Sequence, residues 1–183
     1  DLLLILDEIQ CGMGRSGNMF AWQHYGVKPD VMTVAKALGN GLPVGAFLAC
    51  GKAASAMVPG DHGTTYGGNP LVTAGAKAVL DIFEERHIVD HVKEIGAYLS
   101  EKLDGIVEKY DVVKERRGMG LIQGLEFTGP VGPVVSNALL EQDLVLISAG
   151  ANIIRFVPPL VIGKADVDEM AERLEAAIEA VCG

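Results

Sequence analysis

The sequence predicts an α/β fold in two parts, with an α/β domain over residues 1–90 and a small α+β domain over 91–183. Two features of the first part favour this: short apolar runs alternate with glycine-rich loops, and a long amphipathic helix follows them. After that helix, strand-like runs and short helices fill the remainder of the chain. With 183 residues, the chain is long enough for one ordinary domain or two small ones.

The first part opens with an apolar run at residues 2–6 that ends in Asp7-Glu8. An apolar run with charge only at its carboxyl end is typical of a strand buried on both faces of a mostly parallel sheet. Further strands are predicted at 30–34 and 44–50, separated by glycine-rich loops. Because ligands of open α/β sheets bind at the carboxyl ends of strands, Asp7 is expected at a functional edge.

Helices are predicted at 71–85 and 88–110, and the longer one would join the two parts. Its apolar residues recur at steps of three and four, which indicates one buried stripe. The stripe consists of Ile88, Val92, Ile95, Leu99, Leu103 and Ile106.

The second part has four predicted strands and two predicted helices. The strands are 112–113, 121–127, 145–148 and 153–157, and a helix is predicted at 134–142. In the C-terminal helix, Asp166 and Glu169 resemble a capping box. Its predicted buried stripe is Val167, Met170, Leu174, Ile178 and Val181.

Composition narrows the classes of partner. The formal net charge is -9, whereas nucleic acids and anionic membranes require a basic surface, so neither is expected as a partner. Cys11, Cys50 and Cys182 are scattered, which favours a reducing cytoplasm, and no metal site is expected. No apolar run reaches the length of a membrane span. The chain starts inside a predicted strand and without Met, so we expect it to be part of a longer protein.

Two residues follow predicted strands and suit cofactor chemistry. Lys36 lies between an apolar strand and Ala-Leu-Gly-Asn-Gly, where poor solvation would favour the neutral amine that attacks aldehydes. Asp7 at a strand end requires a positive or hydrogen-bonded partner, which a pyridinium nitrogen would supply. The alternatives are a surface lysine for Lys36, and a helix cap or structural ion pair for Asp7.

Two further sites suit anions. Thr64 and Thr65 follow Gly63 and precede Tyr-Gly-Gly-Asn-Pro, and hydroxyls in a glycine-rich loop suit a phosphate, although an ordinary turn has the same composition. Arg155 lies among apolar residues, where its planar guanidinium would pair with a carboxylate. That carboxylate could belong to a substrate or to an internal salt bridge.

Four long motifs resemble the class III aminotransferases, in the same order and at the same spacing. They are Leu-Asp-Glu-Ile-Gln-Cys-Gly-Met-Gly-Arg-Ser-Gly (6–17), Ala-Lys-Ala-Leu-Gly-Asn-Gly-Leu-Pro-Val-Gly-Ala (35–46), His-Gly-Thr-Thr-Tyr-Gly-Gly-Asn-Pro-Leu (62–71) and Ile-Arg-Phe-Val-Pro-Pro-Leu (154–160). The resemblance covers essentially the whole chain. It implies the C-terminal part of a type I pyridoxal-phosphate-dependent transferase, namely the end of the large, mostly parallel domain plus the small α+β domain.

The resemblance also implies a role for each matching residue. Lys36 resembles the lysine that holds pyridoxal phosphate as a Schiff base, and Asp7 the partner of the pyridine nitrogen. The other implied contacts are cofactor contacts at Glu8, Ile9 (on one ring face) and Gln10 (near the ring hydroxyl), a phosphate contact at Thr65 across a homodimer interface, and substrate contacts at Thr64 and Arg155.

The implied reaction transfers an amino group from an N-acetylated ornithine to 2-oxoglutarate, within arginine biosynthesis. Ornithine, succinylornithine or 4-aminobutyrate transfer and an aminomutase reaction are alternatives of the same class. A domain that folds or associates without catalysis is an alternative of another class. A third alternative is a Rossmann nucleotide binder, because Gly12, Gly14 and Gly17 fit G-x-G-x-x-G after a strand.

Overall fold

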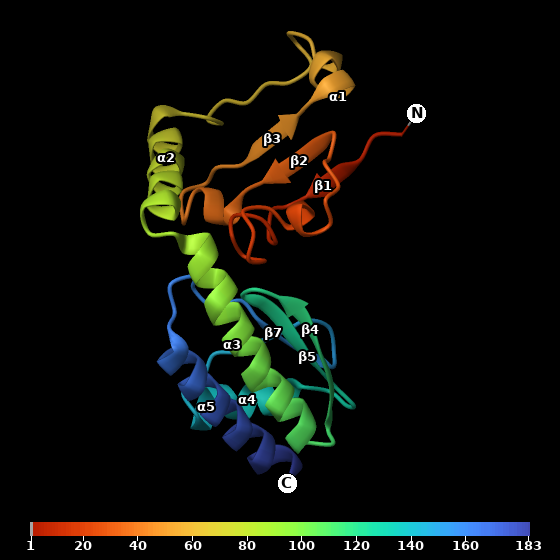
Figure 1. The fold of residues 1–183 in the computed structure, drawn as a ribbon, viewed down its shortest axis with the longest axis vertical. Coiled ribbons are helices and arrows are strands. Elements are labelled where there is room, and N and C mark those ends of the chain that lie inside the picture. Colours follow the sequence, from red (N-terminus) through yellow and green to blue (C-terminus); the bar gives the residue numbers. More distant parts are fainter. Residues whose placement is uncertain (1) are drawn as a thin grey trace. The chain divides into compact units, whose positions relative to one another are not determined.

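The computed structural model describes residues 2–183, and the chain divides into two compact units. The first unit ends at Asp90, and the second spans His91–Gly183. In Figure 1 the colours of the first unit run from red to yellow-green and those of the second from green to blue. Among the described residues, no helix combines the length and the apolar character needed to cross a membrane.

The first unit is built on a three-stranded sheet with flanking helices. Its elements are β1 (Ile5–Asp7), η1 (Ala21–His24), β2 (Val31–Val34), η2 (Lys36–Leu38), β3 (Ala46–Ala49), α1 (Gly51–Ala56) and α2 (Pro70–Glu85). The three predicted strands and the predicted helix at 71–85 are confirmed. The short helices η1, η2 and α1 were not predicted.

The strand order is β1-β2-β3, with β1 and β2 parallel and β3 antiparallel to β2. In the parallel pair, Ile5 lies opposite Val31 and Asp7 lies opposite Thr33. The carboxyl ends of β1 and β2 therefore meet at one edge of the sheet, and this edge carries the candidate site.

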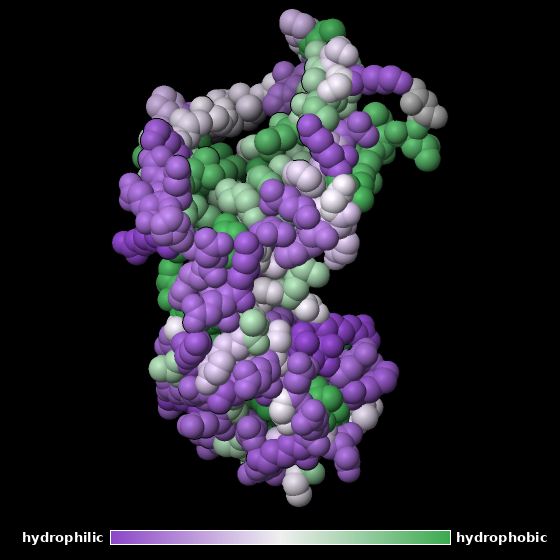
Figure 2. All heavy atoms as spheres, viewed as in Figure 1, coloured by the Kyte–Doolittle hydropathy of each residue, from purple (hydrophilic) through white to green (hydrophobic). Residues whose placement is uncertain are grey.

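The expectation that residues 2–6 are buried on both faces is wrong. Leu2 is 97% exposed and Ile5 is 62% exposed, whereas Val31 and Val34 on β2 are each 4% exposed. The difference arises because β1 is an edge strand with a single neighbour, while β2 lies between two strands. Figure 2 shows the resulting hydrophobic surface around β1 and the residues before it.

Helix α2 begins where its sequence provides a cap. The Asn69 side-chain oxygen accepts hydrogen bonds from the backbone N–H groups of Leu71 (3.1 Å) and Val72 (3.2 Å). Pro70 takes the first helical position, where a missing N–H costs nothing. Asn69-Pro70 thus ends the glycine-rich loop and starts the helix.

The second unit is a four-stranded antiparallel sheet in the order β4-β5-β7-β6. Figure 1 shows α3, α4 and α5 gathered on one side of this sheet. The elements are α3 (Ile88–Lys109), β4 (Val113–Met119), β5 (Ile122–Phe127), α4 (Gly132–Glu141), β6 (Ile147–Ser148), β7 (Ile153–Phe156) and α5 (Lys164–Cys182).

The predicted apolar stripe of α3 is confirmed, because each of its members is at most 5% exposed. The stripe of α5 is confirmed for Val167, Leu174 and Ile178, which are at most 1% exposed, whereas Met170 is only half-buried. Val181 is 38% exposed because it lies in the last turn, beyond the packed part of the helix.

The predicted cap of α5 is half right. The Asp166 carboxylate accepts a hydrogen bond from the Gly163 N–H at 2.7 Å, at the first turn of the helix. Glu169 lies farther along and accepts a hydrogen bond from Arg173 one turn later, at 2.6 Å. Glu169 therefore supports the helix as an i,i+4 pair.

Strand β4 is longer than predicted. The expectation was a short strand at 112–113, which stops before the charged Lys-Glu-Arg-Arg segment. In the structure these residues pair with β5, and Lys114 and Arg117 both bind the carboxylate of Glu126. Ion pairs across the two strands thus allow a charged sequence to form a strand.

Candidate active site

The site residues Asp7 and Lys36 come from neighbouring parallel strands. Asp7 is the last residue of β1 and lies opposite Thr33 on β2. Lys36 follows β2 by two residues and starts η2. A hydrogen bond from the Glu8 N–H to the Thr33 carbonyl (2.9 Å) continues the pairing past the end of β1. The fold therefore brings a carboxylate and an amine to one edge of the sheet.

Lys36 has an unusual backbone conformation. Its φ angle is +47°, in the left-handed region that non-glycine residues rarely adopt. The Lys36 carbonyl accepts hydrogen bonds from the N–H groups of Gly39 and Asn40, both at 3.1 Å, which hold the turn. A side chain at Gly39 would place its Cβ 2.2 Å from the Leu42 carbonyl oxygen, so the tight turn requires glycine there. Strained conformations of this kind cluster at functional sites.

The structure corrects the expected desolvation of Lys36. The side chains of Lys36 and Asp7 are both exposed in this chain. Asp7 is held by its own turn, because its Oδ1 atom accepts a hydrogen bond from the Ile9 N–H at 2.9 Å. This bond orients the carboxylate. Ile9 is half-buried and Gln10 is exposed.

Glu8 points into the unit, unlike its neighbour Asp7. It is 2% exposed, and its carboxylate accepts hydrogen bonds from the N–H groups of Ala21 and Trp22, both at 2.9 Å. The Cys11 thiol lies 3.4 Å from the same carboxylate. Burial, followed by the charge of Glu8, raises the pKa of the Cys11 thiol to about 11, so the thiol stays protonated as a donor. These hydrogen bonds of Glu8 thus connect the turn after β1 to the start of η1.

The alternative of a Rossmann nucleotide site is wrong. A dinucleotide site requires a helix directly after the glycine-rich turn, so that its N-terminus faces the pyrophosphate. Residues 9–20 form turns and bends, and the next helix is the four-residue η1. Gly14 and Gly17 adopt positive φ angles of 77° and 94° within these turns. The glycines serve turn formation.

Thr64 and Thr65 lie in the exposed loop between α1 and α2. The Thr64 hydroxyl accepts a hydrogen bond from the Gly67 N–H at 3.1 Å, which shapes the loop. This loop follows β3, whose last residue, Ala49, lies opposite Val31 at the amino end of β2. The chain therefore leaves the sheet at the end opposite to Asp7 and Lys36, before α2 begins.

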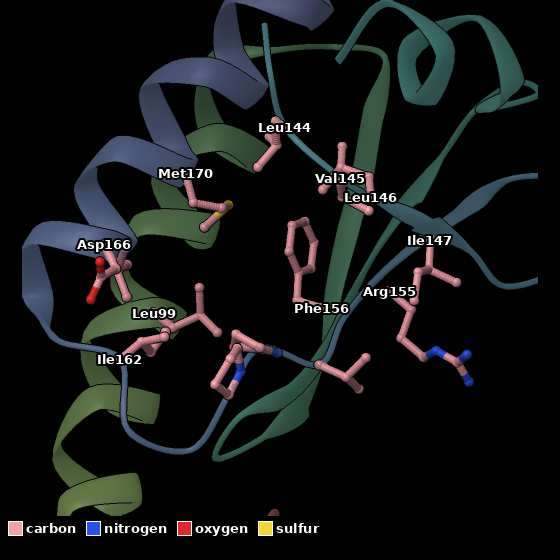
Figure 3. Close-up of a pocket in the computed structure, with 14 residues that line it drawn as sticks. Leu99, Leu144, Val145, Leu146, Ile147, Arg155, Phe156, Ile162, Asp166 and Met170 are labelled. Atoms are coloured by element: carbon pink, nitrogen blue, oxygen red, sulfur yellow. The ribbon is translucent and has the colours of Figure 1, made fainter. Parts of the chain in front are cut away.

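Arg155 belongs to the second unit, on β7. It lies opposite Gly124 on β5 and Ile147 on β6, and its side chain is half-buried. Its neighbours Ile154 and Phe156 face the helices and are 0% and 5% exposed. Figure 3 shows the guanidinium pointing away from Phe156 and Met170.

The same unit has an apolar cavity of about 390 Å³. Leu99, Leu144, Phe156 and Met170 are among the residues that line it, and the Arg155 side chain lies at its margin. Among the residues that the structure describes, no group of three His, Cys, Asp or Glu side chains is arranged to hold a metal ion.

The structure adds a part of the site that the sequence patterns missed, namely the attachment of Glu8 to Ala21 and Trp22. A signal was present in Gly12. A Cβ atom there would lie 2.6 Å from the Glu8 carbonyl oxygen and 3.2 Å from its carboxylate, so glycine is required beside Glu8. A glycine four residues after a strand-end acid is compatible with such close packing, but it does not identify the partner residues.

Solved structures define the class of protein. An ornithine delta-aminotransferase from Plasmodium falciparum matches with a TM-score of 0.91 and 34% identity, over 98% of this chain and 46% of that one. An acetylornithine aminotransferase from Elizabethkingia anophelis matches with a TM-score of 0.89 and 34% identity, over 98% and 46%. The fold is the C-terminal part of a fold type I aminotransferase.

The family model for class III aminotransferases matches residues 1–178, and the chain belongs to this family, whose cofactor is pyridoxal phosphate. Acetylornithine aminotransferase 1 from Bradyrhizobium diazoefficiens is 46% identical over 98% of the chain. An acetylornithine aminotransferase from Gloeobacter violaceus is 47% identical over 95% of the chain. The chain spans 44% of the length of each of these two relatives.

Proposed function

We propose that this protein catalyses pyridoxal-phosphate-dependent amino transfer from N2-acetylornithine to 2-oxoglutarate, giving N-acetylglutamate 5-semialdehyde and glutamate. The observation that carries the proposal is the meeting of Asp7 and Lys36 at the carboxyl ends of two paired parallel strands. A carboxylate and an amine at this edge suit a pyridinium nitrogen and an aldehyde, so the donor set fits the cofactor.

Lys36 and Asp7 have distinct tasks in this proposal. The Lys36 Nζ atom would hold the cofactor covalently, and as a free amine it would take the proton from the substrate carbon that bears the amino group. The Asp7 carboxylate, oriented by the Ile9 N–H, keeps a proton on the ring nitrogen. When bound, the cofactor supplies an electron sink for the charge that remains after the substrate loses that proton.

The remaining predicted contacts complete the site. Ile9 packs on a ring face, and Gln10 lies near the ring hydroxyl. Thr65 donates a hydrogen bond to the phosphate of the neighbouring subunit in a homodimer, and Thr64 contacts substrate. Arg155 binds the substrate carboxylate with two parallel hydrogen bonds, which its guanidinium geometry favours.

The two compact units support an assignment to domains. We assign residues 1–90 to the C-terminal part of the large cofactor-binding domain and 91–183 to the small C-terminal domain. We further propose that the protein is a cytoplasmic homodimer that acts in arginine biosynthesis, as the resemblance to acetylornithine aminotransferases favours. The names of the Bradyrhizobium and Gloeobacter relatives favour acetylornithine as donor. A relative from Pseudomonas aeruginosa is named for succinylornithine as well as acetylornithine, so succinylornithine is the second candidate.

The test uses the full-length protein with Lys36→Ala and, as matched control, Lys28→Ala, an exposed lysine before β2. Lys36→Ala should lose the visible absorbance of covalently bound cofactor and lower turnover by at least about a hundredfold, the scale of acid–base catalysis. The control should match wild type. Amino transfer to 2-oxoglutarate is measured with acetylornithine, succinylornithine, ornithine and 4-aminobutyrate. A yellow Lys36→Ala protein with normal turnover would refute the proposal.

A further inference from the structure

Glu8 is a buried carboxylate directly beside the proposed cofactor residue Asp7. It is 2% exposed, although removing an ionised carboxylate from water is costly unless hydrogen bonds compensate. Two backbone N–H groups, of Ala21 and Trp22, donate to its two oxygens at 2.9 Å, and the Cys11 thiol lies at 3.4 Å. Hydrogen bonds to an ionised acceptor are stronger than those between neutral groups. The hydrogen bonds of this carboxylate therefore hold the turn after β1 and η1 together.

The backbone of Glu8 is held as firmly as its side chain. Its N–H donates to the Thr33 carbonyl at 2.9 Å, and its carbonyl accepts from the Gly12 N–H at 3.1 Å. Thr33 precedes Lys36 by three residues on the same strand and turn. Glu8 thus connects three segments: strand β2 that leads to Lys36, the turn at 9–12, and η1.

The turn at 9–12 also orients Asp7. The Ile9 N–H, one residue after Glu8, donates to the Asp7 Oδ1 atom at 2.9 Å. The Cys11 thiol lies 3.6 Å from the Asp7 carbonyl as well as near the Glu8 carboxylate. Any movement of Glu8 therefore shifts the N–H group that sets the direction of the Asp7 carboxylate.

We propose that Glu8 is a positioning residue, which fixes the Asp7 carboxylate relative to Lys36 through its hydrogen bonds to Ala21 and Trp22. This inference rests on the proposed function, and it replaces the cofactor contact that the resemblance implied for Glu8, whose carboxylate is buried and bonded to Ala21 and Trp22 instead. Asp7 and Lys36 would engage opposite sides of one rigid ring, so their separation must match the ring. Glu8 maintains this separation from within the unit.

Two variants of the full-length protein test the inference. Glu8→Gln keeps the size of the side chain, but its amide group faces one of the two N–H donors, so one hydrogen bond is lost. Ala21→Pro keeps Glu8 and removes the Ala21 N–H group, one of the two that donate to the Glu8 carboxylate. Proline is tolerated there because Ala21 is the first residue of η1 and Phe20 has an extended conformation, with φ -133° and ψ 143°. If Glu8→Gln does not fold, Ala21→Pro by itself tests whether Glu8 positions Asp7.

The controls are Asp7→Asn and Gln123→Ala. Gln123 is also 2% exposed, and its side chain bonds to Gly96 and Gly120 in the second unit. Its loss should lower the melting temperature without affecting the cofactor. The readouts are the affinity of the apo-protein for pyridoxal phosphate, the pH dependence of the visible absorbance of the bound cofactor, and the melting temperature.

Glu8→Gln should weaken cofactor binding by about tenfold and Ala21→Pro by about two- to tenfold, the range for a lost hydrogen bond. Both should shift the pH dependence of the absorbance in the same direction as Asp7→Asn. Wild-type affinity and spectrum in both variants would overturn the inference and leave the proposed function intact. An unshifted spectrum with only a lowered melting temperature, as in Gln123→Ala, would also overturn it. A wild-type protein that binds no pyridoxal phosphate would overturn both proposals.

Discussion

Arg155 presents a guanidinium on the sheet face that the helices leave uncovered. Its partner across β5 is Gly124, which has no side chain, and the next residue in the same row is Arg117 on β4. Paired residues of an antiparallel sheet point to the same face, so the two arginines share it. Arg117 is bound by Glu115 and Glu126. The same face therefore carries one arginine with a structural task and one proposed to bind substrate.

Arg155→Lys should lower kcat/KM for both the amino donor and 2-oxoglutarate. 2-Oxoglutarate presents a carboxylate next to its reacting carbon, and N2-acetylornithine presents one at the opposite end of its chain from the transferred amino group. An ammonium cannot reproduce two parallel hydrogen bonds to either carboxylate. The expected loss is about 2–4 kcal/mol in transition-state binding. Steady-state kinetics on both half-reactions measure it, with Arg117→Lys as the matched control that keeps near-normal rates. If kcat/KM fell for neither substrate, Arg155 would be a structural residue.

Among the elements, α3 and the β4–β5 turn pack unusually closely. A Cβ atom at Gly96 on α3 would lie 2.6 Å from the Gly120 Cα atom. The Gln123 side chain donates to the carbonyls of both glycines, at 3.0 Å to Gly96 and 2.8 Å to Gly120. The absence of a side chain at Gly96 therefore lets the helix approach the turn, and Gln123 holds the contact.

Gly96→Ala should lower the free energy of unfolding by about 1–3 kcal/mol, the usual cost of overpacking, because the added methyl meets backbone atoms that cannot rotate away. Gly105→Ala on the same helix is the control. A Cβ atom there meets nothing within 4 Å, so alanine should stabilise the helix by about 0.5–1 kcal/mol. Urea unfolding distinguishes the two variants. Equal stabilisation by both would refute the close contact.

At the scale of the whole molecule, the exposed loop 62–69 is the segment proposed to act on a second subunit. All residues from His62 to Gly68 are exposed. Gly68 has a φ angle of +67°, a conformation that glycine adopts without strain. A two-fold dimer would place each loop against the cofactor of the other subunit.

Thr65→Val should weaken pyridoxal phosphate binding by about ten- to a hundredfold, because one charge-assisted hydrogen bond contributes about 1.5–3 kcal/mol. Subunit association should persist, since valine keeps the shape of the side chain. The measurement is a cofactor titration of the apo-protein beside sedimentation of the same sample. Thr73→Val on α2 is the control and should bind normally. A monomer that binds the cofactor tightly would contradict the cross-subunit contact.

The sequence by itself determined the longer helices, most of the strands and the strand ends at which chemistry is expected. The α3 stripe from Ile88 to Ile106 is buried as its spacing predicts, because helical periodicity is a local property. Asp7 and Lys36 could be assigned to strand ends because each follows an apolar run. The four motifs predicted the family, and residues 1–178 match it.

Only the tertiary structure decided which of these elements become neighbours. The edge position of β1 exposes Ile5, and the pairing of Lys114 and Arg117 with Glu126 turns a charged segment into strand β4. The burial of Glu8 depends on Ala21 and Trp22, thirteen and fourteen residues farther along the chain. Burial and ion pairing depend on residues that folding brings together from distant positions, whereas periodicity and strand ends depend on adjacent residues.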